Sequence, residues 1–298
     1  MRVGLQIPRF TWPGGDAAIA PELARIVREA EDVGFDSVWV MDHFWQIRGV
    51  GRPEEPMLEG FTTLGWMAAL TKRVELGLLV GGVHYRHAPL WVKAATTLDV
   101  LSGGRAWLGI GAAWNQDESE GLGFPFPPLA DRFEQLEETL RYAHRMWSGE
   151  HGDEGVFEGA HLRATRLLNS PQSIRRPRVP IMIGGGGEQK TLRLVAQYGD
   201  ACNVFGTADK LRHKYRVLEE HCRRLGRPFE EIERTTLQTF RAHENEQGPQ
   251  ESANQALDRF AELANAGART IIFNIRDVWR PGVMDVVGRD LIPGLKAL

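Results

Sequence analysis

The fold is decided by residues 180–203, which read PIMIGGGGEQKTLRLVAQYGDACN. A short apolar run, typical of a buried β-strand, leads into the glycines at 184–187. A segment with one apolar stripe at helical spacing follows, and a second strand-like run begins at residue 201. This order predicts a β-strand, a loop and an α-helix, followed by the strand of the next unit.

The same pattern recurs along the whole chain of 298 residues. Strand-like runs lie at residues 2–7, 37–41, 74–80, 106–110, 180–183, 201–204, 232–238 and 270–273. Eight βα units in this length predict a (β/α)8 TIM barrel, an α/β fold with its catalytic residues at the carboxyl ends of the strands. A doubly wound sheet is the alternative, but QIPRFTWPGG, and no GxGxxG, follows the first strand.

Residues 148–178 interrupt this alternation before the fifth strand. The segment lacks a sustained helical stripe and contains GVFEGAHLRATRLLNSP, which indicates a small hairpin and loop. We expect this insertion to form a lid over the barrel mouth. No linker or low-complexity tract is apparent, so residues 1–298 are expected to form a single catalytic domain.

Composition excludes several classes of function. Lysine and arginine number 36 against 39 aspartates and glutamates, a net charge of −3, so the chain has no charge signature for nucleic acid or an anionic membrane. The strand-like N-terminus, MRVGLQIPRF, lacks a signal-peptide core, and we expect a cytoplasmic protein. His84 and His87 have HxxH spacing without acidic or thiolate partners in register, so no metal site is expected.

The predicted strand ends bring chemically versatile side chains to one face of the barrel. The polar ones are Asp42, His43, His84, Asn115 and Asn203, and the aromatic ones are Phe10, Trp12, Trp45, Trp114 and Phe205. Aromatic walls suit a flat aromatic ligand, and a glycine loop before a helix suits a phosphate. The alternatives that involve no ligand are a tight turn at the glycines, a helix cap at Asp42 and a surface histidine at His43.

Several motifs occurring in order carry a family resemblance. They are MRVGLQIPRFTWPGG, GFDSVWVMDHF, YRHAP, TTLDVLSGGRAWLGIGAAWN, PFPPLADRFEQLEETL and PIMIGGGGEQKTLRLVAQYGDACN. Together they resemble the luciferase-like monooxygenase superfamily, and within it the F420-dependent oxidoreductases of actinobacteria. The resemblance covers residues 1 to 235 approximately.

This resemblance implies a barrel with an insertion, commonly a homodimer, that holds the deazaflavin coenzyme F420 at the strand ends. It further implies a non-proline cis peptide bond at Leu79–Val80, pressed against the coenzyme ring. The coenzyme-binding residues expected from it are Asp42, His43, Leu79, Val80, Gly81, Ala113, Asn115, Gly184, Gly185, Gly186, Gly187 and Asn203. The four glycines would hold the phosphate.

One position departs from the family pattern. The sugar-phosphate dehydrogenases of this branch carry a catalytic glutamate three residues before the asparagine, where this chain has Ala112. We therefore predict a reductase that transfers hydride to an electron-poor C=C or C=N bond of a small organic substrate. His43 or a water would donate the proton, and Asp42 would hold the imidazole tautomer.

Two other functions stay open at this point. An FMN-dependent monooxygenase would use the same phosphate loop, and a non-catalytic coenzyme carrier would bind without turnover. No motif in the chain identifies the substrate.

Overall fold

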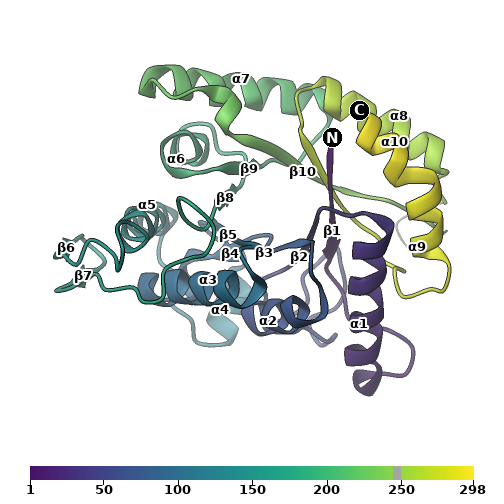
Figure 1. The fold of residues 1–298 in the computed structure, drawn as a ribbon, viewed down its shortest axis with the longest axis horizontal. Helices are drawn as coiled ribbons and strands as arrows, with labels where there is room; N and C mark the ends of the chain where they lie inside the picture. Colours follow the sequence, from purple (N-terminus) through teal and green to yellow (C-terminus); the bar gives the residue numbers. More distant parts are fainter. Residues whose placement is uncertain (244–249) are drawn as a thin grey trace.

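The computed structural model describes residues 1–243 and 250–298 and contains a closed barrel of parallel strands (Figure 1). The barrel strands, in chain order, are β1 Arg2–Ile7, β2 Ser37–Val40, β3 Glu75–Leu78, β5 Ala106–Gly111, β8 Ile181–Gly184, β9 Ala201–Asn203, β10 Glu233–Thr239 and β11 Thr270–Asn274. Each pairs in parallel with the next, and β11 pairs with β1. The predicted TIM barrel is confirmed.

Helices surround the barrel, and most of them have one apolar face, which packs on the strands, and one polar face. The longer ones are α1 Asp16–Val33, α2 Gly60–Leu70, α3 Ala88–Ser102, α5 Leu129–Met146, α6 Thr191–Tyr198, α7 Ala208–Leu225 and α8 Ala253–Asn265. Short elements are β4 Gly81–Gly82, η1 Val83–Tyr85, α4 Gln116–Gly121, η2 Phe229–Glu231, α9 Val283–Val286, η3 Val287–Leu291 and α10 Ile292–Ala297. In α7, Leu211, Leu218 and Cys222 are buried against the barrel, and Gly226 ends the helix in the left-handed conformation.

Large side chains fill the barrel interior below the strand ends. Trp39 and Trp107 pack with their rings 6.1 Å apart, together with Met182 and Ile272. A Cβ at Gly77 would stand 2.5 Å from the Trp39 ring, so only glycine fits there. This layer fills the barrel interior beneath the carboxyl ends of the strands.

The insertion lies elsewhere than we expected. Residues 148–178 contain the predicted hairpin, β6 Phe157–Glu158 and β7 Arg163–Ala164, which lies at the outer edge of the molecule beside α5 (Figure 1). Downstream, Asp99 of α3 accepts backbone hydrogen bonds from Ile174 and Arg175, and Arg175 pairs with Glu75. These contacts hold the segment along the outside of the barrel, so the lid prediction was wrong.

A histidine anchors the short helix α4 beside the barrel mouth. His84 Nε2 lies 2.8 Å from Ser119 Oγ, and that hydroxyl donates to the backbone oxygen of Asn115. The hydroxyl oxygen must therefore accept from His84 Nε2–H, which leaves the buried Nδ1 as a bare lone pair without a partner in the described chain. Burial, with the charge of Arg132, lowers the pKa of His84 from 6.5 to about 4.

This anchor predicts an acid-sensitive contribution to stability. The folded protein keeps His84 neutral, whereas the unfolded chain takes up the proton near pH 6.5, so the stabilisation is present above pH 6.5 and is lost as the pH falls towards 4. Over this window the free energy of unfolding of the wild type should fall by up to about 1.4 kcal/mol per pH unit more than that of His84→Gln. Urea unfolding at several pH values measures this, with the exposed His87→Gln as control. Parallel curves for the wild type and His84→Gln would contradict it.

Candidate active site

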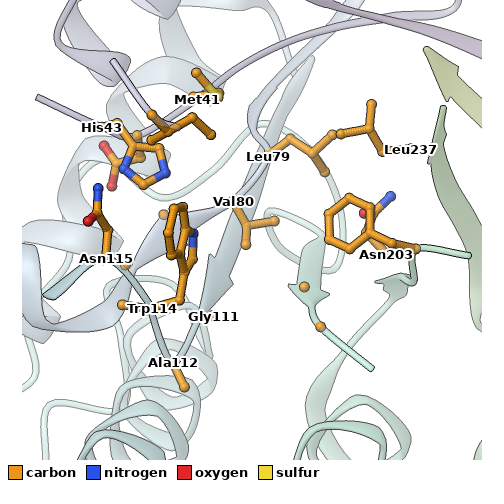
Figure 2. Close-up of a pocket in the computed structure, with 18 of the residues that line it drawn as sticks. Met41, His43, Leu79, Val80, Gly111, Ala112, Trp114, Asn115, Asn203 and Leu237 are labelled. Carbon is orange, nitrogen blue, oxygen red and sulfur yellow. The ribbon is translucent and has the colours of Figure 1, made fainter. Parts of the chain in front are cut away.

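The strand ends enclose a cavity of about 590 Å³. Its walls include the predicted site residues Asp42, His43, Leu79, Val80, Gly81, Ala113, Asn115, Gly184, Gly185, Gly187 and Asn203; Gly186 alone of that set is not among the lining residues. His43, Trp114 and Asn115 stand at one side of the cavity, with Asn203 and Leu237 at the other (Figure 2). Residues from at least five strand ends therefore share one space.

The glycine loop bounds one end of this cavity. A Cβ at Gly184 would stand 2.5 Å from Val80 Cγ2, and Gly185 has a φ of 121°, which favours glycine. The backbone N–H groups of Gly186 and Gly187 have no acceptor within the described residues, and α6 begins at Thr191 just beyond them. Free N–H groups before a helix N-terminus fit an anion such as a phosphate.

Asn203 presents a buried acceptor next to this loop. Its Nδ2 donates to Thr235 Oγ1 at 2.7 Å, because that hydroxyl gives its own hydrogen to the carbonyl of Cys202. The network thus fixes the amide orientation and leaves Asn203 Oδ1 buried without a partner in the described part of the chain. A hydroxyl or N–H donor of a bound molecule would satisfy this oxygen.

Leu79 and Val80 form the wall between the two ends (Figure 2). The bond joining them is a non-proline cis peptide, at the position that the family resemblance implied. Val80 packs against Gly184, and a Cβ at Gly111 would stand 3.3 Å from Val80 Cγ2. The glycines of two neighbouring strands thus make room for the Val80 side chain.

His43 is held by a carboxylate that the sequence analysis did not single out. Its Nδ1 lies 2.7 Å from Glu118 Oε2, and the Glu118 side chain is fully buried. Tyr85 donates to the same carboxylate at 2.6 Å. The other carboxylate oxygen accepts the backbone N–H groups of Phe44 and Trp45. Burial raises the pKa of Glu118, but the hydrogen bonds from His43 and Tyr85 outweigh it and hold that pKa below its ordinary value.

The contact with Glu118 uses one ring nitrogen of His43 and leaves the other available for proton transfer. With Nδ1 committed to Glu118, Nε2 has no protein partner in the described residues, and the ring lines the cavity. The Trp114 ring stands edge-on to the imidazole, with centroids 5.6 Å apart. His43 can therefore give or take a proton at Nε2 with its orientation fixed.

Asp42 has a different partner from the one we expected. Its two oxygens accept a bidentate pair of hydrogen bonds from Arg86, at 2.7 and 2.8 Å, and Arg86 also pairs with Glu59. Burial raises the pKa of Asp42 against the pull of Arg86, while Asp42 and Glu59 raise the pKa of Arg86 in spite of burial. The bidentate geometry is that of an ion pair. Asp42 thus ties the end of β2 to Arg86, and Glu118, not Asp42, contacts the imidazole.

Some other expected site residues lie apart from the cavity. Phe10, Trp12 and Trp45 are not among its lining residues; the Trp45 side chain packs against Gly121 instead. His84 lines a separate hollow of about 430 Å³ with Phe124 and Pro127. Of the predicted aromatic walls, only Trp114 and Phe205 border the main cavity.

Among the residues at the site that were not predicted from the sequence, Glu118 and the hydroxyl of Tyr85 contact or support His43. Glu118 comes three residues after Asn115, on the helix that follows β5, and this spacing was the available signal. In the described ranges, 1–243 and 250–298, no three His, Cys, Asp or Glu side chains gather as a metal site. Within the same ranges, no helix has the length and apolar character needed to cross a membrane.

Comparisons with known proteins agree with this architecture. Residues 1–292 match the family model described as luciferase-like monooxygenase. An F420-dependent glucose-6-phosphate dehydrogenase of Kineococcus radiotolerans is 36% identical over 169 residues, 56% of this chain and 47% of that protein. The enzyme of the same name from Gordonia bronchialis is 30% identical over 225 residues, 72% and 62% of the two chains. The chain thus spans about half to three-fifths of the length of these curated relatives.

Solved structures with low sequence identity share the fold. An F420-dependent secondary alcohol dehydrogenase in complex with an F420–acetone adduct superposes with a TM-score of 0.83 at 17% identity, over 99% of this chain and 98% of that one. EDTA monooxygenase from Chelativorans sp. BNC1 gives 0.82 at 14% identity, over 100% and 93%. With a family model that matches nearly the whole sequence, the chain belongs to the luciferase-like monooxygenase family.

Proposed function

We propose that this protein is an oxidoreductase that uses coenzyme F420 and reduces an electron-poor C=C or C=N bond of a small organic substrate. The observation that carries the proposal is His43, held by Glu118 with its Nε2 toward a cavity whose other walls are the glycine loop and the Leu79–Val80 bond. The names of the relatives from Kineococcus and Gordonia support the choice of coenzyme.

The residues present fit such a coenzyme. The free N–H groups of Gly186 and Gly187 would hold its phosphate, and the buried Oδ1 of Asn203 would accept a hydrogen bond from its tail. Leu79 and Val80 would back the ring. When bound, the reduced deazaflavin supplies a hydride from C5 of its ring.

His43 is the proton carrier in this proposal. Because Nδ1–H donates to Glu118, a second proton on the ring sits at Nε2, where it can pass to the substrate atom next to the one that is reduced. The Glu118 carboxylate balances the charge of the imidazolium while that proton is present. Solvent then restores the proton at Nε2.

The remaining ionisable groups that line the cavity already have hydrogen-bond partners in the protein. Among the described lining residues these are Asp42 and Tyr85: Asp42 is held by Arg86, and the Tyr85 hydroxyl donates to Glu118. Burial and that hydrogen bond raise the pKa of Tyr85, so it keeps its proton. Ala112 contributes only a methyl group. His43 therefore takes the role that a glutamate at position 112 would otherwise share.

From the family resemblance, we further propose that the protein is a cytoplasmic homodimer that acts on a small molecule. The alternative is an FMN-dependent monooxygenase, because the same glycine loop suits the phosphate of either coenzyme. Coenzyme choice separates the two.

Coenzyme titration is the first test. We expect the protein to quench F420 fluorescence at micromolar or lower concentration and to bind FMN at least tenfold more weakly. With the reduced coenzyme, an activated alkene or imine should then be reduced without consumption of oxygen. Tighter binding of FMN, together with oxygen uptake, would replace the proposal by the monooxygenase.

The phosphate position can be tested at Gly186. A Cβ there would meet only Val204 Cγ1 at 3.7 Å and Lys214 Cε at 3.8 Å, both ordinary contacts, so Gly186→Asn should fold normally. Gly186→Asp adds a negative charge where an anion is held and should weaken coenzyme binding at least tenfold relative to Gly186→Asn. Fluorescence titration measures the ratio, and equal affinities in the two variants would place the phosphate elsewhere.

The proton step can be tested at His43 and Glu118. His43→Asn should lower the rate of hydride transfer by roughly 10²-fold to 10⁴-fold, the range expected for general acid catalysis, with little effect on coenzyme affinity. Glu118→Gln keeps an oxygen for the backbone N–H groups of Phe44 and Trp45 but removes the charge, so we expect a smaller loss.

The two changes should combine less than additively because they act on one proton. Single-turnover oxidation of reduced coenzyme from pH 5 to 9 measures them, with the exposed Glu120→Gln on α4 as control. An unchanged rate in His43→Asn would assign the proton to bound water instead.

A further inference from the structure

We infer that the substrate is an uncharged, largely apolar molecule with one neutral hydrogen-bonding group, which the Gln6–Asn274 pair contacts. This inference rests on the proposed function for the location of the substrate beside His43. It adds the chemical class of the substrate and the residues that select it.

The described residues that line the cavity offer no lysine or arginine to an anionic substrate, and the charge of a protonated His43 is already balanced by the Glu118 carboxylate. Residues 244–249, which lie outside the described ranges, read ENEQGP and contain neither lysine nor arginine. A phosphate or carboxylate on the substrate would therefore lose water without gaining a positive partner that is not already paired, which is strongly unfavourable.

Two arginines close to the cavity are already hydrogen-bonded to other groups of the protein. Arg86 is held by Asp42 and Glu59. Arg132 donates to the backbone oxygens of Ala112 and Ala113, at 3.0 and 2.8 Å. Using either to bind a substrate anion would break the bonds that hold the ends of β2 and β5 in position.

Arg276 also faces protein atoms. It donates to the carbonyl of Val50 at 3.2 Å and to that of Gly49, both on the loop that follows β2. That loop carries Val50, which borders the cavity. The guanidinium thus supports the back of a wall whose cavity side is apolar.

Apolar side chains dominate the walls and the rim. Ile47, Val50 and Leu237 are among the apolar lining residues, and Ile47 and Val50 belong to the loop that follows β2 and His43. At the rim, Trp114 is 60% exposed, Leu129 54% and Phe205 50%. Large apolar side chains gathered around one opening mark a surface that an apolar ligand covers.

One neutral polar pair interrupts this apolar surface. Gln6 and Asn274 are register partners on β1 and β11, and Asn274 Nδ2 donates to Gln6 Oε1 at 3.3 Å. Thr239 Oγ1 donates to the other end of the Asn274 amide. The second amide group of Gln6, Nε2, has no protein partner in the described chain, and Gln6 lines the cavity. An amide at this position selects a carbonyl or similar neutral group.

The class of substrate can be tested by binding, without turnover. Isothermal titration calorimetry on the protein, with and without oxidised coenzyme, should detect cyclohex-2-enone and give at least tenfold weaker binding for the same ring carrying a carboxylate. Glucose 6-phosphate should show no binding at millimolar concentration. Equal or tighter binding of either anion, or no binding of the enone, would overturn the inference. Binding of the enone without its reduction would instead overturn the proposed function alone.

Two variants test the residues. Gln6→Met, of similar length, should weaken enone binding about fivefold to tenfold, as the loss of one hydrogen bond predicts, and leave coenzyme affinity unchanged. Val50→Arg places a cation on the apolar wall and should shift the preference at least tenfold toward the carboxylate, whereas Val50→Leu should not. If Val50→Arg leaves the preference as in the wild type while the variant unfolds at the wild-type temperature, the wall does not face the substrate and the inference fails.

Discussion

The burial of Glu118 is the constraint on which the barrel mouth depends. A carboxylate without solvent contact is costly unless donors surround it, and here the donors come from segments far apart in the sequence. The backbone at Phe44 and Trp45 follows β2, Tyr85 belongs to η1, and Asn115 Nδ2 contributes at 3.3 Å from the end of β5. These hydrogen bonds tie three loops to one point.

The position of the His43 ring follows from this same burial. His43 lies immediately before the backbone groups that Glu118 accepts, so fixing that backbone also fixes the imidazole. His84 acts on the adjacent residue of α4 by bonding to Ser119, which keeps the helix that carries Glu118 in place. Acid that protonates His84 would therefore weaken the support of the site as well as the stability of the fold.

Much of this architecture could be predicted because it is local. Strand positions follow from short apolar runs, and the observed strands differ from the predicted ones by at most two residues at either end. The Leu79–Val80 bond was placed by the family resemblance, since spaced motifs carry their register with them. The glycine loop follows from the local order of a strand, four glycines and a helix. The glycines at 184 and 185 are required by a close contact and by a positive φ, which are properties of single positions.

The rest could not be predicted because it depends on long-range partners. Asp42 is next to His43 in sequence, yet its carboxylate meets Arg86, 44 residues away, while His43 meets Glu118, 75 residues away. The insertion was expected over the mouth, but Asp99 binds its backbone at Ile174, also 75 residues distant. The periodicity of a sequence indicates which face of a helix or strand is buried. It does not indicate which polar groups of distant segments will contact that helix or strand.

The composition of the cavity is the basis on which we propose a substrate other than the one in the relatives' names. Those relatives are named for a phosphorylated sugar, and similarity reaches only about half to three-fifths of their length. The parts that bind a coenzyme phosphate need only backbone N–H groups and glycine, which this chain has. A substrate phosphate would need a cation, and Arg86 and Arg132 beside the cavity already hold Asp42 and the Ala112 carbonyl. In our proposal, coenzyme binding and substrate choice therefore rest on different residues, which would allow the family to share the coenzyme while the substrate differs.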